Sequence, residues 1–439
     1  MEKKQLALAL LSAAFALNIH AQKVKFTEYD LSNGLHVILH QDKSAPVVAV
    51  TVFYHVGSKN EDTGRTGFAH FFEHLLFEGT ENIKHGEWSK IVSSNGGTEN
   101  ASTTQDRTFY HETFPSNQLE LGLWMESERM LHPVISETGV KTQNEVVKEE
   151  KRQRIDNQPY GHFQEEIGKR LFTIHPYRWQ TIGSMADLDA AKLEEFRAFF
   201  KKYYVPNNAV LSIAGDIDID KTKSWVAAYF TDIPRGNDIV RKKYIEVPIA
   251  KEITDTAYDA NIQIPGIMAA YRTPGIVSEE AKVLEMITAY LSNGASSKLY
   301  KKMVDEKKNA VQVGAFNAVL EDYGSYITYA LPNNNASLPD LLKDIDEEIA
   351  KMQQDLISEQ DYQKLLNQFE NNYVSANTRM LGIAENLAEG YAFHNKNTNS
   401  INEQLDEYRK ITREQIKEVA RKYLNQNQRV VLYYLPKEK

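Results

Sequence analysis

A repeat of one helix and one strand constrains the fold of this chain more than any other feature of its sequence. Residues 202–211 contain KYY, then Asn and Val-Leu, and residues 422–431 contain KYL, Asn and Val-Val at the same spacing, 220 residues later. Each copy follows an amphipathic helical pattern, at residues 193–201 and 414–421. A single match can arise by coincidence, but a true repeat with this period indicates two similar domains of about 220 residues.

The length of 439 residues also suits two domains. Strand-like and helix-like patterns alternate in both halves, which predicts α/β or α+β layers, and we expect each domain to be a mainly antiparallel sheet packed by helices. Residues 234–251 are charged and bracketed by prolines, which is typical of a linker. The expected domains are therefore residues 22–233 and 252–439.

Individual elements follow from the hydrophobic pattern and the turn residues. The Asn33-Gly34 pair lies between strand-like residues 26–30 and 35–40 and predicts a hairpin. The other expected elements are strands at 47–56 and 210–214 and helices at 67–77, 118–130 and 139–157.

The first 21 residues have the pattern of a secretory signal peptide. Lys3 and Lys4 precede an apolar run at residues 6–17, and a short polar stretch with Ala21 follows. The run is too short for a bilayer core, which needs roughly 20 residues, and no later segment is long and apolar enough to cross one. We therefore expect an exported protein, periplasmic or secreted and without membrane insertion, whose mature chain starts near Gln22. An N-terminal buried or amphipathic helix is the alternative.

Composition excludes several other classes of protein. There is no cysteine, so stability has to come from core packing, and a lipid anchor on an N-terminal cysteine is excluded. The formal net charge is −9, and loss of Glu2, Lys3 and Lys4 with the signal peptide leaves −10. An acidic chain without a basic tract argues against nucleic acid as a partner.

One helical segment carries the residues of a metal site. His70 and His74 are four positions apart, so both imidazoles lie on one face of a helix with Glu73 beside them. Imidazole nitrogens suit Zn²⁺, and a catalytic zinc site has three protein ligands and one open position. Glu73 is then placed to take a proton from a water molecule that attacks a peptide carbonyl. In the alternative, the histidines are satisfied core groups and the glutamate pairs with an arginine.

Spacing alone does not identify the third ligand. The candidates are imidazoles and carboxylates that follow the motif, namely His85, Glu99, His111, Glu145, Glu149 and Glu150. The glutamates at residues 139–157 alternate with lysine and arginine, which is also typical of a solvated helix face.

Beyond the motif, the sequence resembles the pitrilysin family of zinc metallopeptidases, which use the inverted motif H-x-x-E-H. The two-domain layout is similar to that of its short, processing-peptidase-like members. The segments that carry the resemblance are HFFEHLLFEGT, NGGTENASTTQDRTFYHETF, EVVKEEKRQRIDNQPYG, HPYRWQTIGSMADL and YYVPNNAVLSIAGD, with SNGASSKLY in the second half.

The resemblance implies the rest of the site. The family's third ligand corresponds to Glu150, 76 residues after the second histidine, with Glu149 as the fallback. A supporting glutamate of the family, seven positions earlier, is Gln143 here, and an amide can still donate a supporting hydrogen bond. The resemblance thus implies a Zn²⁺ site made of His70, His74 and Glu150, with Glu73 as the catalytic residue.

The family also binds its substrate by pairing an extended peptide with an edge strand. The matching segment is residues 98–104, and its candidate substrate-binding residues are Asn100, Ala101 and Thr103. Main-chain pairing gives affinity with little demand on the peptide sequence. An interior strand is the alternative for this segment.

The second half departs from the pattern of an active site. It contains no H-x-x-E-H, and the helix expected around residues 282–291 has no metal-ligand pattern, so this domain is expected to be non-catalytic. In the family, active members made of one chain or of a homodimer carry an arginine and a tyrosine that grip the substrate near the zinc, and Val304 and Val311 occupy these positions. Valine side chains form no hydrogen bonds. We hypothesise that a homologous subunit without zinc supplies the missing Arg/Tyr pair in a heterodimer.

Together these features predict an exported zinc metalloendopeptidase that hydrolyses unfolded peptides or oligopeptides inside an enclosed chamber. The alternative is a non-catalytic scaffold or peptide-binding subunit of a larger assembly, because some relatives of this family have lost activity. The complete set of metal ligands favours the enzyme.

Overall fold

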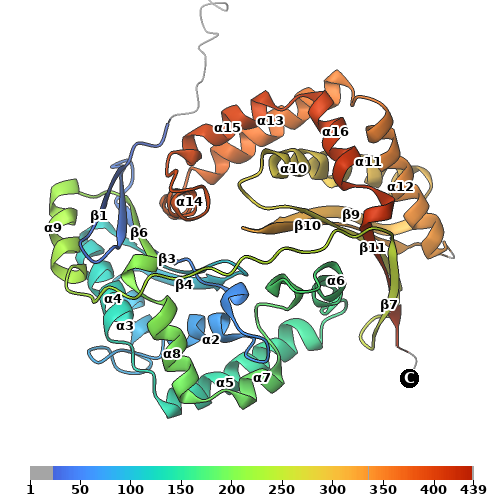
Figure 1. Ribbon diagram of the computed structural model, residues 1–439. Helices are drawn as coiled ribbons and strands as arrows, with labels where there is room; N and C mark the ends of the chain where they lie inside the picture. The colour runs from blue at the N-terminus through green and yellow to red at the C-terminus, as the bar shows by residue number, and fades with distance from the viewer. Residues whose placement is uncertain (1–22, 335, 438–439) are drawn as a thin grey trace, which may run out of the picture.

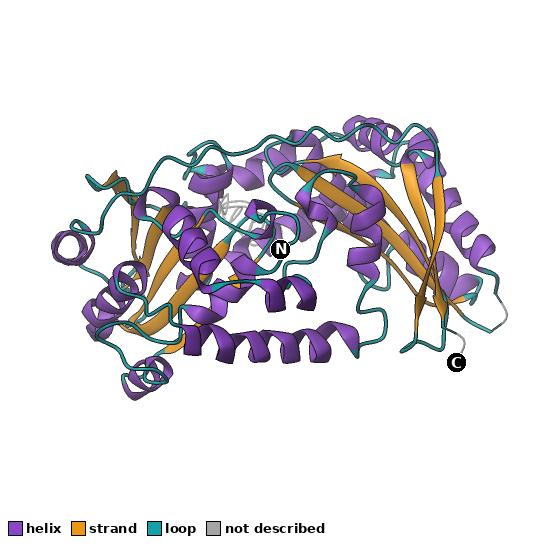
Figure 2. Ribbon diagram, turned by 60° about the horizontal axis from the view of Figure 1, so that its bottom comes forward, coloured by secondary structure: helices purple, strands orange, loops and turns teal. Residues whose placement is uncertain are grey.

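The computed structural model describes residues 23–334 and 336–437, so the predicted signal peptide lies outside the described residues. Two mixed sheets lie side by side, each with helices packed on its faces (Figures 1 and 2). Within the described residues, no helix combines the length and the apolar character needed to cross a membrane. The predicted architecture of two similar α/β halves is confirmed.

The first sheet has six strands in the order β1-β2-β6-β3-β5-β4. β1 Thr27–Asp30 and β2 His36–Gln41 form the predicted hairpin, and Gly34 in its turn has a φ of 89°, which glycine adopts without strain. All neighbouring strands are antiparallel except β2 and β6, which are parallel. The other strands are β3 Val47–Tyr54, β4 Thr98–Thr103, β5 Thr108–Pro115 and β6 Ala209–Gly215.

The second sheet repeats this arrangement without the first strand. Its order β7-β11-β8-β10-β9 corresponds to β2-β6-β3-β5-β4, and its parallel pair, β7 with β11, corresponds to β2 with β6. α8 Leu193–Tyr203 matches α16 Arg413–Tyr423, and β6 matches β11, both at the offset of 220 residues, so the predicted repeat is confirmed. The strands are β7 Ile253–Asp259, β8 Gly266–Pro274, β9 Ala310–Val319, β10 Tyr323–Pro332 and β11 Arg429–Pro436.

The three predicted helices are present, with small shifts at their ends. They are α2 Phe68–Leu75, α4 Leu119–Leu131 and α5 Glu137–Lys151, and α5 continues into a π-helical stretch at Arg152–Asp156. The remaining helices are α3 Trp88–Ser94, α6 Phe163–Leu171, α7 Met185–Ala190, α9 Ile219–Phe230, α10 Glu279–Ser292, α11 Lys298–Tyr300, α12 Leu338–Gln354, α13 Glu359–Ala376, α14 Met380–Phe393 and α15 Ser400–Lys410.

Helices cover both faces of the first sheet, and one of them comes from the other half of the chain. Val48, Val50 and Val52 of β3 face the core shared with α2, α4 and α8, whereas Ala49 and Phe53 face α14. In the opposite direction, α6 from the first half packs on β8 and β11 of the second sheet. The two halves therefore exchange one helix each (Figure 1).

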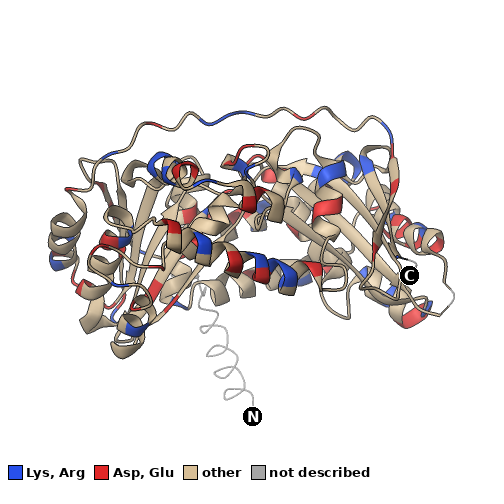
Figure 3. Ribbon diagram, turned by 90° about the horizontal axis from the view of Figure 1, so that it is seen from below, with Lys and Arg blue, Asp and Glu red and all other residues tan. Residues whose placement is uncertain are grey.

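Residues 234–252 contain no helix or strand and run from one half to the other along the outside of the molecule (Figure 3). Glu246 in this connector accepts hydrogen bonds from the backbone N–H groups of Thr173, Ile174 and His175. Burial alone would raise the pKa of Glu246, but these bonds lower it to about 2. The connector is therefore fixed to the segment that follows α6.

A cluster of ion pairs joins the two halves at the turn between β9 and β10. Lys59 of the first half lies 2.9 Å from Asp106 and also pairs with Glu321 and Asp322 in that turn. His55 lies 2.7 Å from Glu321. Burial alone would raise the pKa of Glu321, but His55 and Lys59 lower it to about 2.

This cluster predicts a loss of stability in acid. The pKa of Glu321 falls from 4.5 to about 2 on folding, so its stabilising effect is complete above about pH 4.5 and is lost as the pH falls towards 2. We expect the free energy of unfolding, measured with urea, to fall more steeply over this pH range in the wild type than in Glu321→Gln. The exposed control Glu306→Gln should keep the wild-type slope. Equal slopes for the wild type and Glu321→Gln would contradict the prediction.

Candidate metal centre

α2 is a short apolar helix whose N-terminus is capped by a buried carboxylate. Glu61, only 4% exposed, accepts hydrogen bonds of 2.9 Å from the N–H groups of Gly67 and Ala69. Such groups at the start of a helix have no partner within the helix itself. On its buried side, Phe71 and Phe72 are fully enclosed by the core. The orientation of α2 is thus fixed from its first turn.

A fully buried arginine fixes the other end of α2. Arg129 of α4 donates a hydrogen bond of 3.1 Å to the carbonyl oxygen of Leu76, which follows the helix. Glu112 of β5 and Glu126 pair with this guanidinium at 2.9 Å and 3.0 Å, and all three side chains are fully buried. The guanidinium also lies over the rings of Phe77, Trp88 and Tyr110. Sequence reasoning missed this group and Glu61, because no motif spacing connects their elements.

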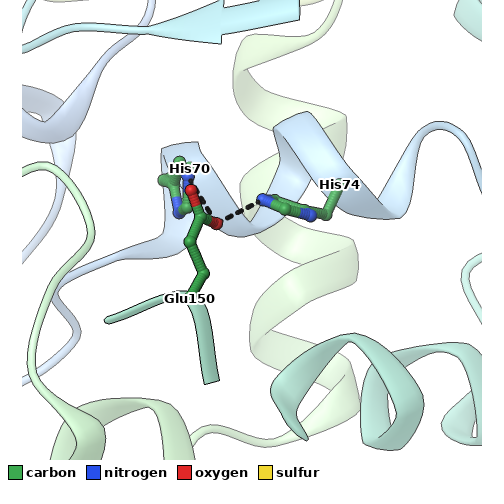
Figure 4. A group of neighbouring side chains, drawn as sticks. All are labelled: His70, His74 and Glu150. Carbon is green, nitrogen blue, oxygen red and sulfur yellow. Dashed lines mark ion pairs between the residues drawn. The ribbon is translucent and has the colours of Figure 1, made fainter. Parts of the chain in front are cut away.

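His70 and His74 lie one turn apart on α2, and Glu150 reaches them from α5 (Figure 4). The Nε2 atoms of His74 and His70 lie 3.0 Å and 3.5 Å from the same Glu150 oxygen, Oε2. The candidate ligand atoms of all three residues lie within 4.8 Å of one another. In the described part of the chain, no other group of three or more such side chains is arranged to share a metal ion.

The donor set fits a zinc ion. Two imidazole nitrogens and one carboxylate oxygen are ligands that zinc uses in sites with an open position. Glu150 Oε2 is buried and has no hydrogen-bond partner among the described residues, while Arg154 holds Oε1 at 2.6 Å. Burial and the neighbouring His74 lower the pKa of His70 to about 4, so His70 is neutral, as a metal ligand has to be. Burial opposes ionisation of Glu150, but the two histidines and Arg154 lower its pKa.

Glu73 lies between the two histidines in sequence and contacts the neighbouring edge strand. Its Oε2 accepts a hydrogen bond of 2.5 Å from the hydroxyl of Thr103 on β4. Burial raises the pKa of Glu73, although the Thr103 hydrogen bond and His74 oppose this effect. A carboxylate with a raised pKa is a better proton acceptor near neutral pH. The arrangement can therefore combine a metal ion with a base one turn away.

The structure separates the six candidates for the third ligand. Glu150 adjoins both histidines, whereas Glu149 is exposed and pairs with Arg152 at 2.9 Å. His85 is also exposed and pairs with Glu78 at 2.8 Å. The other three have different surroundings: Glu99 contacts Ser89, Glu145 pairs with Lys148, and His111 lies on β5 next to Phe109.

Gln143 contacts the end of α2 rather than the metal-ligand candidates. Its amide donates a hydrogen bond to Glu78, four residues after His74. Among the described residues, no hydrogen bond joins its side chain to the three ligand candidates. The support implied by the resemblance is therefore indirect and consists of a link between α5 and the segment after α2.

β4 is an edge strand of the first sheet, at the end opposite β1, because it pairs with β5 alone among the described strands. This position rules out the alternative of an interior strand. Asn100, Ala101 and Thr103 all lie on β4, and the exposed Asn100 side chain accepts a hydrogen bond of 2.9 Å from the Ala101 N–H. An edge strand of this kind offers main-chain groups to an added strand.

Val304 and Val311 lie in the half built on the second sheet, whereas α2 and α5 belong to the half built on the first (Figure 1). Val304 is part of the π-helical stretch Lys301–Glu306 and is half-buried. Val311 lies on β9, an edge strand of the second sheet, and is 50% exposed. Both positions are thus at least partly accessible to another molecule.

Comparison with known proteins identifies the family. Residues 36–184 match the family model described as insulinase, peptidase family M16, and residues 190–369 match the one described as the peptidase M16 inactive domain. The zinc protease PqqE of Helicobacter pylori is 30% identical over 366 residues, which cover 81% of this chain and 82% of that protein. The chain belongs to the M16 peptidase family. The resemblance to the pitrilysin family, of which these are the models, is therefore confirmed.

Solved structures of M16 proteins share the fold. A protease from Helicobacter pylori has a TM-score of 0.89 and 27% identity, covering 94% of this chain and 99% of that one. An M16 inactive-domain protein from Pseudomonas fluorescens has a TM-score of 0.84 and 16% identity with the same coverage. Among the sequence relatives, an uncharacterised zinc protease of Rickettsia felis is 25% identical over 378 residues. These residues cover 85% of this chain and 89% of that protein. The H-x-x-E-H motif lies in the region matched by the insulinase model, and the second half has none.

The geometry predicts that Glu150, and not Glu149, binds a divalent metal ion. Glu150→Gln should lower the affinity for zinc at least about 100-fold, since even the loss of an outer-shell group costs about 10–100-fold. Glu149→Gln makes the same chemical change on the exposed neighbour and should leave the affinity unchanged. Competition with a chromophoric chelator measures both constants. Equal affinities for the two variants would show that Glu150 is not a ligand.

Proposed function

We propose that this M16 chain is an exported zinc metalloendopeptidase that cuts unfolded peptides. The observation that carries the proposal is the convergence of His70, His74 and Glu150 next to a half-buried Glu73. Membership of the M16 family, and relatives that are named zinc proteases, support it.

In the proposed mechanism, His70, His74 and Glu150 would hold Zn²⁺, which when bound would supply a Lewis acid for the peptide carbonyl and for a water molecule. Glu73 is placed to accept a proton from the water molecule that attacks the carbonyl carbon. The same carboxyl then gives the proton to the amine of the leaving peptide. Thr103 orients the base, because its hydroxyl donates to one carboxylate oxygen and leaves the other to accept the proton.

We propose that the substrate binds as an added strand on β4. The hydrogen bond between Thr103 and Glu73 supports this, because it links the edge strand directly to the base. A peptide paired with β4 would thus lie beside the carboxylate. This binding mode selects unfolded peptides, since it recognises an extended main chain.

The proposed enzyme is the zinc-bearing subunit of a heterodimer that encloses a chamber. Val304 and Val311 support this, because neither can form the side-chain hydrogen bonds that the resemblance leads us to expect at these positions. A homologous subunit without zinc would then supply the Arg/Tyr pair. Export to the periplasm or out of the cell is proposed from the signal pattern of residues 1–21.

Replacement of the base should abolish turnover without loss of zinc. Glu73→Gln keeps the size of the side chain but cannot accept the proton, so cleavage of a mixed pool of unstructured peptides should fall by about 10²–10⁴-fold at equal zinc content. Exposed Glu81→Gln is the matched control and should keep the wild-type rate. Mass spectrometry of the products measures both. Unchanged cleavage by Glu73→Gln would exclude it as the base.

If a partner subunit supplies the Arg/Tyr pair, the chain alone should cleave peptides slowly. Adding the homologous partner, or introducing Val304→Arg with Val311→Tyr, should raise kcat/KM at least about tenfold, which corresponds to about 1.4 kcal/mol of added transition-state stabilisation. Val304→Leu with Val311→Phe adds bulk without these hydrogen bonds and should have no such effect. A fully active wild-type monomer or homodimer would refute the heterodimer. If zinc is bound but no pairing cleaves peptides, the chain is a peptide-binding or scaffold subunit.

A further inference from the structure

An acidic cavity lies where the helices of the two halves meet. It has a volume of about 260 Å³ and is bounded by α10, which packs on the second sheet, by α14, which packs on the first, and by α15. Figure 1 shows these three helices together at the junction of the halves. None of the metal-ligand candidates lines this cavity. The lining residues with charge or titratable groups are Lys282, Glu285, Glu389, His394, Glu407 and Tyr408.

The single lysine of the cavity is already paired. Lys282 lies 2.5 Å from Glu407, so these two charges balance each other. Glu285 accepts a hydrogen bond from the Tyr408 hydroxyl, which brings no positive charge. Burial raises the pKa of Glu285 against the effect of that bond and of Lys282. Glu285 therefore lacks a cation of its own.

The histidine of the cavity does not supply the missing charge. Burial lowers the pKa of His394, and the positive charge of Lys282 lowers it further, while Glu407 acts in the opposite direction. His394 is therefore neutral near pH 7. The cavity is left with two carboxyl groups in excess of its cations.

Glu389 is the group that points to a ligand. Among the described residues, no hydrogen bond or ion pair satisfies its carboxyl, and burial raises its pKa. Arg107 acts on it only at a distance, because this guanidinium donates to Glu385, one helical turn earlier, and to Ser102. Glu389 is half-buried and lines the cavity, so its carboxyl group is available to a group that enters the cavity.

We propose that this cavity binds an ammonium or guanidinium group between Glu285 and Glu389. Such a cation brings several N–H donors together with its charge, and so matches two carboxylates. A metal ion fits less well, because among the described residues these carboxylates belong to no group of three or more such side chains that could hold one.

The size of the cavity indicates what carries the cation. Its volume of about 260 Å³ is just below the range of roughly 300–1,000 Å³ that small-molecule sites occupy. The cation is therefore carried by a short aliphatic chain, either in a free alkylamine or in a lysine or arginine side chain of a peptide. Binding here is independent of the proposed peptidase activity and is measured without turnover.

The experiment is calorimetric titration of the whole chain with n-butylammonium chloride at pH 8, with n-butanol as the uncharged probe. We expect the wild type to bind the ammonium and not the alcohol. Glu389→Gln should weaken binding at least tenfold, because it removes the charge and keeps the shape. Glu403→Gln, on α15 but outside the cavity, should bind as the wild type does. Circular dichroism checks that each variant is folded.

Equal affinity of the wild type and Glu389→Gln, equal binding of n-butanol, or no binding of the ammonium would each overturn the proposal. If Glu389→Gln does not fold, wild-type crystals soaked in 3-bromopropylammonium give a second test. Bromine anomalous density in the cavity supports the site, and density only at other places refutes it.

Two peptides then distinguish the sources of the cation. They are unstructured and identical except for one position, which is lysine in the first and norleucine in the second. If the lysine peptide alone displaces n-butylammonium from Glu73→Gln protein, the natural ligand is a basic side chain. If neither displaces it, the ligand is a free amine, and both results support the same cation chemistry.

Discussion

The position of the candidate site depends on an arginine without contact to solvent. Burying a charge costs several kcal/mol unless it is paired, and Arg129 has two carboxylates for this purpose. Burial and the nearby Glu126 raise the pKa of Glu112 well above its usual range, while Arg129 opposes this effect. Because this guanidinium has one possible orientation, its bond to Leu76 fixes the end of α2, as Glu61 fixes the start. His70 and His74 are thus held on a helix anchored at both ends, and only Glu150 has to reach them from another element.

The core of the site could be predicted because its residues follow helical spacing. His70, Glu73 and His74 fall within five positions, and local geometry alone places them on one face. Glu150 could not be selected in this way, because it belongs to a helix whose other glutamates have the same appearance in sequence. The family resemblance selected it, and the structure brings it to both histidines. The edge position of β4 likewise depends on the order of strands in the sheet, which no local pattern contains.

The buried groups that hold the end of α2 are indicated less clearly in the sequence. Strand alternation on β5 turns Glu112 to the same side as Tyr110 and Phe114, so a charged residue stands at a core position and requires a partner. That pattern could have indicated a buried ion pair, although not the identity of Arg129. No sequence pattern predicts that α6 and α14 each pack on the sheet of the other half. An apolar helix face shows that the helix is covered, but it does not show which sheet covers it.

This exchange of helices has a consequence for how the molecule can move. Phe53 and Phe109 on the first sheet are enclosed by α14, which follows the connector, and the second sheet depends in the same way on α6, which precedes it. A hinge at the connector would pull both helices off their sheets and open two cores to water. The ion pairs of Lys59 with the β9–β10 turn add to this constraint. The two halves are therefore coupled, because a motion that separates them exposes two cores to water at once.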